Sequence, residues 1–238
     1  MEYQQIFPAV FLERPNRFTA VCSLAGAEVL AHVKNTGRCR ELLVTGAQVL
    51  LQHHPAPGRK TRYTLTHVQK GDRLVHIDSQ APNRLVGEAL QNGSLSLPGL
   101  GELRVVRPET FYGASRFDFY LEGTKAKGFA EVKGVTLEED GWARFPDAPT
   151  ERGVKHLDHL IQAAQEGYLC YAVFVIQMGG IRLFSPNWRT HPAFGQALVS
   201  AQNAGVRLLA YETDVTPLRV ELAGPVPIDL EKGRNEPC

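Results

Sequence analysis

The sequence predicts a mixed protein of the α+β or α/β class with two domains: a small N-terminal β-barrel, residues 1–82, and a larger domain of helices and strands, residues 83–238. Three observations support this. Short runs rich in β-forming residues fill the first part of the chain, the hydrophobic period changes from two to about 3.6 near residue 83, and strands then alternate with helices. The 238 residues are enough to build two hydrophobic cores.

The N-terminal barrel is predicted from six short strands separated by turn-forming residues. Gly26, Gly46 and the pair Gly71-Asp72 are among these turns. The strands are VFLER, FTAVCSL, EVLAHVK, AQVLLQHH, TRYTLTHVQ and RLVHIDS. Five or six short strands in about 80 residues favour a small barrel of the OB type.

The larger domain is expected to begin with a helix, because Leu85, Val86, Ala89 and Leu90 have helical spacing. Three strands follow, in ELRVVRPETFYG, ASRFDFYLEG and KGFAEVKGVTL. TERGVKHLDHLIQAAQEG is an amphipathic helix with Thr150 as its N-cap. The apolar run YLCYAVFVIQ predicts a strand covered on both faces, and a helix in HPAFGQALVSAQNAG and a strand in VRLLAYE complete the order αβββαβαβ.

Composition favours a cytoplasmic protein. No apolar run approaches the roughly 20 residues that cross a membrane, and the N-terminal segment lacks the basic and small-residue features of a signal peptide. The four cysteines contain no Cys-x-x-Cys pair, which fits a reducing compartment and gives no zinc-site spacing.

Basic side chains gather in the N-terminal part, although the formal net charge of the chain is only +1. Up to residue 70 there are nine Lys and Arg residues against four Asp and Glu. Such an excess is typical of a protein that binds a phosphate backbone, and a mildly basic solvated surface is the alternative. The candidate contacts lie in or near turns of the barrel, where OB-type proteins often meet nucleic acid: Arg14, Arg17, Lys34, Arg38, Arg59 and Lys60.

The stretch FAEVKGVTL places a glutamate and a lysine on one face of a predicted strand. Because side chains alternate along a strand, Glu131 and Lys133 point the same way. In a hairpin whose turn is centred on Thr124 and Lys125, Asp118 lies opposite Glu131. The same register places Phe119 opposite Ala130 and Phe117 opposite Val132, with the apolar residues together on the other face.

Two carboxylates directly across a strand pair repel each other unless a cation lies between them. Lys133 is one candidate cation, and a divalent ion such as Mg2+ is the other, since it binds carboxylates together with waters and phosphates. Glu88 on the preceding helix could reach the same cluster. A cross-strand ion network that only stabilises the sheet is the alternative interpretation.

The helix in FPDAPTERGVKHLDHL places four polar side chains on its non-apolar face, where they are either solvated or in contact with phosphates beside the carboxylates. They are Arg152, Lys155, His156 and His159.

Six blocks of the sequence, in order, resemble the sugar fermentation stimulation protein A (SfsA) family: NTGR, GRKTRY, APNRLVGEAL, YGASRFDF, EVKGVTL and FPDAPTERGVKHL. The resemblance implies an N-terminal OB fold and a PD-(D/E)XK nuclease-like domain with an αβββαβ core. It places the family motif on Asp118, Glu131 and Lys133, with Glu88 on the first helix of the core. Two departures are visible: His32-Val33-Lys34 precedes NTGR, and Gly134 stands where the family usually has serine.

The combined hypothesis is a DNA-binding protein of low sequence specificity with a metal-dependent nuclease site. Mg2+ or Mn2+ is expected on Asp118, Glu131 and the Val132 carbonyl, with Lys133 positioning the attacking water and Glu88 supporting the metal. The expected phosphate contacts in this domain are Arg116, Arg152, Lys155 and His156. A non-catalytic DNA-binding regulator of sugar (maltose) metabolism and a small-molecule sensor are the alternatives. The sequence is compatible with a homodimer and does not fix the oligomeric state.

Overall fold

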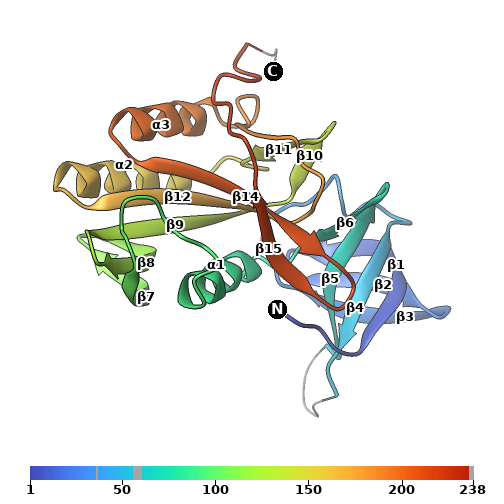
Figure 1. The fold of residues 1–238 in the computed structure, drawn as a ribbon. Helices are drawn as coiled ribbons and strands as arrows, with labels where there is room; N and C mark the ends of the chain where they lie inside the picture. Colours follow the sequence, from blue (N-terminus) through green and yellow to red (C-terminus); the bar gives the residue numbers. More distant parts are fainter. Residues whose placement is uncertain (36, 56–60, 236–238) are drawn as a thin grey trace.

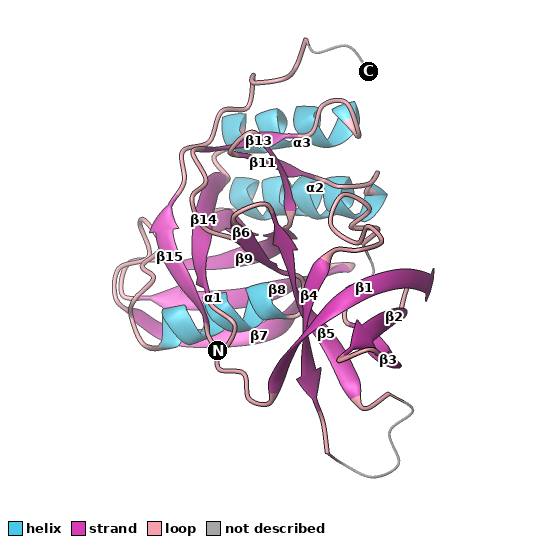
Figure 2. Cartoon of the chain, turned by 90° about the vertical axis from the view of Figure 1, so that its right-hand side faces the viewer, coloured by secondary structure: helices cyan, strands magenta, loops and turns pink. Residues whose placement is uncertain are grey.

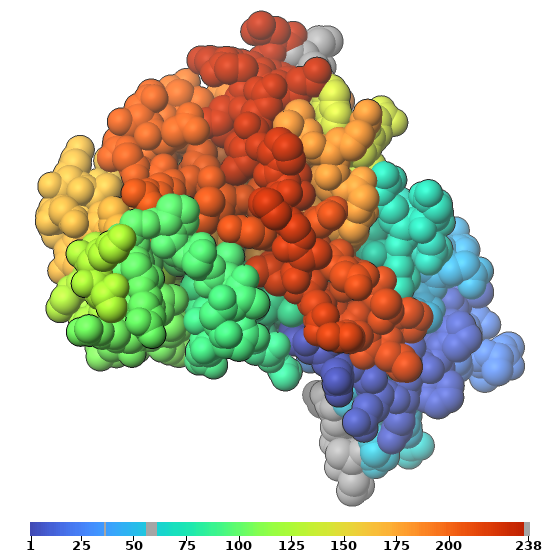
Figure 3. All heavy atoms as spheres, in the orientation of Figure 1, coloured from blue at the N-terminus to red at the C-terminus, as the bar shows by residue number. Residues whose placement is uncertain are grey.

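The structure is a computed structural model, and it describes residues 1–35, 37–55 and 61–235. The N-terminal strands form one lobe and the rest of the chain forms a larger one (Figure 1). The two lobes lie against each other in the space-filling view (Figure 3). The N-terminal segment joins them, because Tyr3 N donates to Leu218 O at 2.8 Å and Met1 bonds to Val220.

The N-terminal lobe is a closed barrel, as the sequence predicts. Its strands are β1 (Ile6–Asn16), β2 (Thr19–Leu24), β3 (Ala27–Val33), β4 (Gln48–His53), β5 (Tyr63–Lys70) and β6 (Arg73–His76). They are ordered β3-β2-β1-β4-β5-β6, and a parallel pairing of β3 with β5 closes the first five into a barrel. Alternate side chains such as Phe11, Leu51 and Leu65 fill the interior and are at most 2% exposed. The OB-type prediction is confirmed.

The larger lobe is built on a six-stranded mixed sheet in the order β15-β14-β12-β9-β8-β7. The strands are β7 (Leu103–Tyr112), β8 (Ser115–Gly123), β9 (Lys127–Val135), β12 (Leu169–Ile176), β14 (Arg207–Val215) and β15 (Val220–Pro225). β9, β12 and β14 are parallel neighbours. All residues of β12 except Leu169 are buried, which confirms that this strand is covered on both faces.

Helices cover the two faces of this sheet unequally. α1 (Ala81–Gln91) lies on one face, and α2 (Glu151–Gln165) and α3 (Pro192–Asn203) lie on the other (Figures 1 and 2). Leu85 and Val86 of α1 pack in one buried cluster, and Leu157 and Phe194 of α2 and α3 pack in another. The predicted order αβββαβαβ is therefore present. None of the helices formed by the described residues has the length and apolar character that crossing a membrane requires.

A small three-stranded sheet is the main element that the sequence analysis misses. It consists of β10 (Leu137–Glu139), β11 (Trp142–Phe145) and β13 (Leu183–Pro186), in that order. Its strands are three or four residues long, too short to carry a readable alternation, and β11 pairs with β13 across about forty residues of chain that include α2. Strand β15 is also absent from the prediction.

The predicted N-cap of α2 is confirmed, because the Thr150 hydroxyl accepts a hydrogen bond from Gly153 N at 3.1 Å. Thr150→Ala removes this bond and is expected to lower the free energy of unfolding by about 1 kcal/mol, measured by urea denaturation. Thr150→Ser keeps the hydroxyl and should recover most of the loss. Equal destabilisation by both variants would show that the hydroxyl does not cap the helix.

Candidate active site on the mixed sheet

Glu131 lies in the middle of β9 and is only 3% exposed. Its Oε1 accepts hydrogen bonds from Lys133 Nζ, at 2.6 Å, and from His156 Nδ1. Its Oε2 is buried and has no hydrogen-bond partner among the residues that the structure describes. The Lys133 side chain is 19% exposed. The acid and the lysine of FAEVKGVTL are therefore a buried pair and not a surface ion pair.

His156 holds the Glu131 carboxylate from the side of α2. Arg152 Nε donates to His156 Nε2 at 3.3 Å. A ring nitrogen that accepts a hydrogen bond carries no proton, so the proton of the neutral imidazole is on Nδ1, where it is donated to Glu131. These two hydrogen bonds link three side chains: Arg152 orients His156, and His156 orients Glu131.

Asp118 approaches the same place from β8. Its Oδ2 accepts a hydrogen bond from Val132 N at 2.7 Å, and its Oδ1 accepts one from Asn83 Nδ2 of α1 at 2.6 Å. The predicted hairpin register is confirmed where β8 pairs with β9, from Phe119–Ala130 to Glu122–Lys127. Beyond Phe119 the Asp118 side chain takes the place of a backbone partner for Val132.

The predicted position of Phe117 opposite Val132 is wrong. Its ring lies 5.2 Å from the ring of Phe129, which shares a face of β9 with Glu131. Phe119 instead packs with Ala130 and Val132 in the cluster beneath α1. Phe117 and Phe119 thus lie on opposite faces of the sheet, so the alternation of β8 breaks at Asp118, as it does where a strand bulges. The Asp118 carboxylate is turned toward Val132 of β9 and Asn83 of α1.

The two carboxyl groups have different proton affinities. Burial, and then the negative charge of Glu131, raise the pKa of Asp118 to about 6. Burial also raises the pKa of Glu131, but the hydrogen bond from His156 and the charge of Lys133 outweigh it, so the pKa of Glu131 lies below its ordinary value. At neutral pH both groups are ionised, and the Asp118 carboxylate is held at an energetic cost.

The arrangement fits a divalent cation bound by oxygen atoms. Glu131 Oε2 is a buried acceptor that lacks a donor, and Asp118 lies close enough for the two charges to interact. In a strand, N–H and C=O of one residue point to the same side, so the Val132 carbonyl faces Asp118 as its N–H does. Mg2+ is commonly held by one or two carboxylates with water in the other positions. Within the described ranges, no three His, Cys, Asp or Glu side chains converge as a metal site, so the protein would supply two carboxylates and a carbonyl.

Comparison with protein families identifies the chain. The family model described as the SfsA N-terminal OB domain matches residues 12–77, and the one described as the sugar fermentation stimulation protein RE domain matches residues 80–219. The chain belongs to the SfsA family. It thus combines an OB domain with a restriction-endonuclease-like (RE) domain, in agreement with the two lobes.

Relatives in this family cover almost the whole chain. The sugar fermentation stimulation protein homolog of Desulfitobacterium hafniense (strain DSM 10664 / DCB-2) is 50% identical over 98% of this chain and 100% of its own length. The homolog of Clostridium beijerinckii is 48% identical over 89% of this chain and 92% of its own. The solved structure of Pyrococcus furiosus SfsA in complex with Ca2+ superposes with a TM-score of 0.85 at 28% identity, over 96% of this chain and 98% of that one.

Glu88 does not join the carboxylates, contrary to the expectation from the SfsA resemblance. Its side chain is 44% exposed and binds Arg84 Nε at 2.7 Å, with the N-terminal amine of Met1 at 3.7 Å. The α1 residue that reaches the site is Asn83. Nothing in the helical pattern of APNRLVGEAL distinguishes Asn83 from a solvated amide, so the sequence analysis missed it.

His156 is also placed differently from the prediction. The sequence predicts it on a polar face of α2, solvated or in contact with phosphates, but it is buried against Glu131 and orients that residue. Arg152 and Lys155 are exposed on α2 beside it. Arg116 is exposed and paired with Glu109 at 2.8 Å. Of the four predicted phosphate contacts, His156 is bonded to Glu131 and Arg152 is tied to the site through His156.

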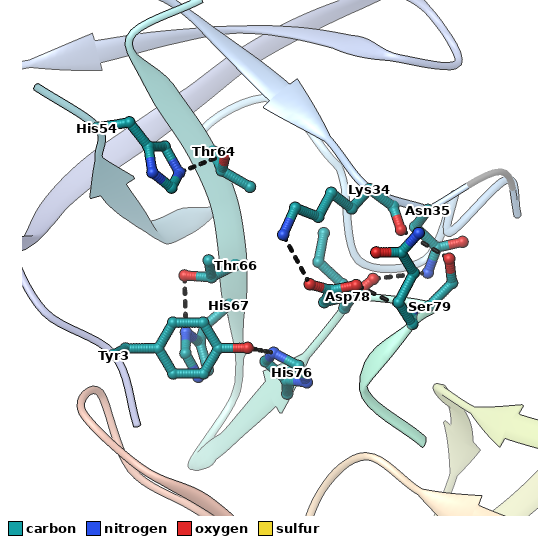
Figure 4. Close-up of polar contacts among 12 residues, drawn as sticks. Tyr3, Lys34, Asn35, His54, Thr64, Thr66, His67, His76, Asp78 and Ser79 are labelled. Carbon is teal, nitrogen blue, oxygen red and sulfur yellow. Dashed lines mark hydrogen bonds and ion pairs between the residues drawn. The ribbon is translucent and has the colours of Figure 1, made fainter. Parts of the chain in front are cut away.

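The basic residues of the OB domain have three different positions. Arg14 donates to four backbone carbonyls of the neighbouring loops, so its guanidinium stabilises the loop fold. Lys34 is paired with Asp78 at 3.3 Å (Figure 4). Arg17 and Arg38 are exposed and line a cleft of about 600 Å³ together with Arg40. The predicted contacts Arg59 and Lys60 lie outside the described residues.

Proposed function

We propose that this SfsA protein is a metal-dependent nuclease that hydrolyses phosphodiester bonds in DNA. The observation that carries the proposal is the buried Glu131 carboxylate, which has one oxygen bound to Lys133 and His156 and the other open beside Asp118. A structural ion pair has no need of an open buried oxygen, because an unpaired buried acceptor is costly. The Ca2+ in the P. furiosus relative supports the proposal, since Ca2+ and Mg2+ share a preference for oxygen ligands.

The residues present divide the work of the reaction. Asp118, Glu131 and the Val132 carbonyl would hold Mg2+ or Mn2+. When bound, the ion supplies charge stabilisation at the phosphate and lowers the pKa of a bound water. Asn83 and the Val132 N–H orient Asp118, and the Arg152–His156 pair orients Glu131. Lys133 Nζ lies at the Glu131 carboxylate, where it positions the attacking water or stabilises the charge that develops on the phosphate.

Cleavage of labelled single-stranded, duplex and branched DNA in Mg2+, Mn2+ or EDTA tests the proposal. We expect metal-dependent cutting that Lys133→Met reduces by about 100-fold, because one preorganised cation is lost at the reacting phosphate. Lys127→Met, at the exposed start of the same strand, is the matched control and should cut normally. Cleavage that survives EDTA, or that Lys133→Met leaves unchanged, would contradict the assignment.

A non-catalytic DNA-binding regulator is the second candidate, favoured by the exposed arginines of the OB domain, which lie in a cleft of their own. DNA binding measured in parallel, at low salt where phosphate contacts are strongest, separates the two functions. Tight binding with no cutting of any substrate would favour the regulator. In that case Asp118→Ala would leave the DNA affinity intact.

A further inference from the structure

A cavity of about 280 Å³ lies where the OB domain meets the RE domain. The OB side contributes the loop after β3 and the segment after β6, and Figure 4 shows Asn35 and Ser79 side by side there. The RE side contributes the end of β9 with Gly134, the loop before α2, and Gln177 directly after β12. In parallel sheets, ligands bind beyond the carboxyl ends of the strands, and this cavity occupies that position for β9 and β12.

The cavity is adjacent to the candidate active site. Gly134 directly follows Lys133, and it is about 10 Å along the strand from Glu131. Thr150, also in the lining, lies about 9 Å along the axis of α2 from His156. One extended strand of DNA can therefore place neighbouring nucleotides in the cavity and at the candidate active site.

The lining offers hydrogen bonds of both kinds from neutral groups. Asn35 is 8% exposed, and its Nδ2 already donates to Ile77 O at 2.9 Å, which leaves one N–H of the amide. Gln177 is 1% exposed, and its Nε2 donates to Asp78 O at 3.0 Å. Within the described ranges, no donor bonds to Gln177 Oε1, which lies 2.6 Å from the position that a Cβ on Gly134 would take. A buried amide with an open oxygen in a cavity wall is an acceptor available to a ligand.

The charged residues of the lining are one cation and one anion, Arg144 and Asp147, and Arg144 is also paired with Glu139 at 3.3 Å, so the cavity has no excess of positive charge that would favour a phosphate. Asp147 lines the cavity itself and would repel a phosphate there. The exposed cations lie outside it in the cleft of the OB domain, namely Arg17, Arg38 and Arg40, and Lys133, paired with Glu131, lies at the active site. That cleft and the cavity share Gly37 and Ala148 in their linings, so they adjoin each other. A strand of nucleic acid has neutral bases and charged phosphates, so a base in the cavity and phosphates in the arginine cleft would match the two places.

We propose that the cavity holds one unstacked nucleobase of the strand that is cut, and that the adjoining backbone runs into the arginine cleft. The volume is near the lower end of the range of about 300–1,000 Å³ for small-molecule pockets, which suits one base and excludes a base pair. The proposal rests on the nuclease function for the identity of the ligand. It names the substrate class as DNA with an unpaired nucleotide, in a single strand, a flap or a frayed end, because a base must leave the duplex to enter.

The test uses single-stranded oligonucleotides that carry 2-aminopurine at one position at a time, with Ca2+ in place of Mg2+ and with EDTA in a parallel series. A base that leaves the stack fluoresces more strongly, so we expect a rise confined to one or two adjacent positions. Ala148→Tyr adds bulk to the wall shared by cavity and cleft and should abolish the rise and weaken binding about tenfold. Ala27→Tyr, on the exposed end of β3, is the matched control and should behave as wild type.

A second series keeps the wild-type protein and changes only the DNA, so it does not depend on the folding of a variant. Removing the base at the fluorescent position should weaken binding about tenfold, and removing other bases should not. A flat response in both series, with normal cutting of duplex DNA, would overturn the base pocket and leave the nuclease intact. A position-specific response without cutting in Mg2+ would support the pocket and contradict the nuclease.

Discussion

Glu131→Gln is expected to reduce metal-dependent cleavage by about 100- to 1,000-fold. The glutamine oxygen can replace Oε1 and keep the hydrogen bonds from Lys133 and His156. Its amide nitrogen then occupies the position of Oε2, the buried oxygen that has no partner among the described residues. An N–H donor there points at the cation, so the site loses a ligand and one negative charge, and with them several kcal/mol of charge stabilisation. Initial rates in Mg2+ and Mn2+ measure the loss.

Glu138→Gln is the matched control, because Glu138 is also a buried glutamate of the RE domain, with a side chain 4% exposed and paired with Lys70 at 2.7 Å. It tests whether loss of any buried carboxylate reduces the rate. We expect Glu138→Gln to be less stable but to cut at a normal rate per folded molecule, and both variants to bind DNA as wild type does. Glu131→Gln that cuts within threefold of wild type would show that Glu131 holds no catalytic metal.

The closeness of Asp118 and Glu131 was predictable because it follows from local pattern. The apolar residues of β8 and β9 favour the register in which Phe119 pairs with Ala130, and Asp118 and Glu131 follow directly at the end of that pairing. The break in alternation at Asp118 was not predictable. It accompanies the contact of Asp118 with Asn83, which lies 35 positions earlier on α1, and the packing of Phe117 on Phe129 across the hairpin. The same reasoning that found the pair therefore misplaced Phe117.

Burial of polar residues was the second limit on prediction from sequence. A histidine on a helix is expected to face water, and His156 is buried because Glu131 provides a partner that the helix pattern does not contain. Glu88 shows the reverse, since Arg84 one turn earlier is a nearer partner for it than the site. Helical periodicity gives the face of a residue, but its partner is fixed by tertiary structure.

Asp118→Asn is expected to change the dependence of stability on pH. The folded-state pKa of Asp118, about 6, lies above its ordinary value of 3.8, so between these values the folded state binds more protons than the unfolded state. Stability of the metal-free protein therefore falls as pH rises through this window, by about 2–3 kcal/mol from this group. Asparagine does not titrate, so the stability of wild type relative to Asp118→Asn should fall by that amount between pH 4 and pH 7.5. Urea unfolding in EDTA at successive pH values measures this difference.

Divalent cations should restore the stability that is lost when Asp118 ionises. This links the stability measurement to the candidate metal site. At pH 7.5, Ca2+ at 100 times its Kd should stabilise the wild type by about 2.7 kcal/mol and Asp118→Asn far less, because a ligand that binds only the folded state shifts unfolding by its binding free energy. Asp158→Asn, exposed on α2, should match the wild type in both experiments. If Asp118→Asn kept the wild-type pH dependence and the full response to Ca2+, the carboxyl pair would be a structural feature of the sheet and not a metal site.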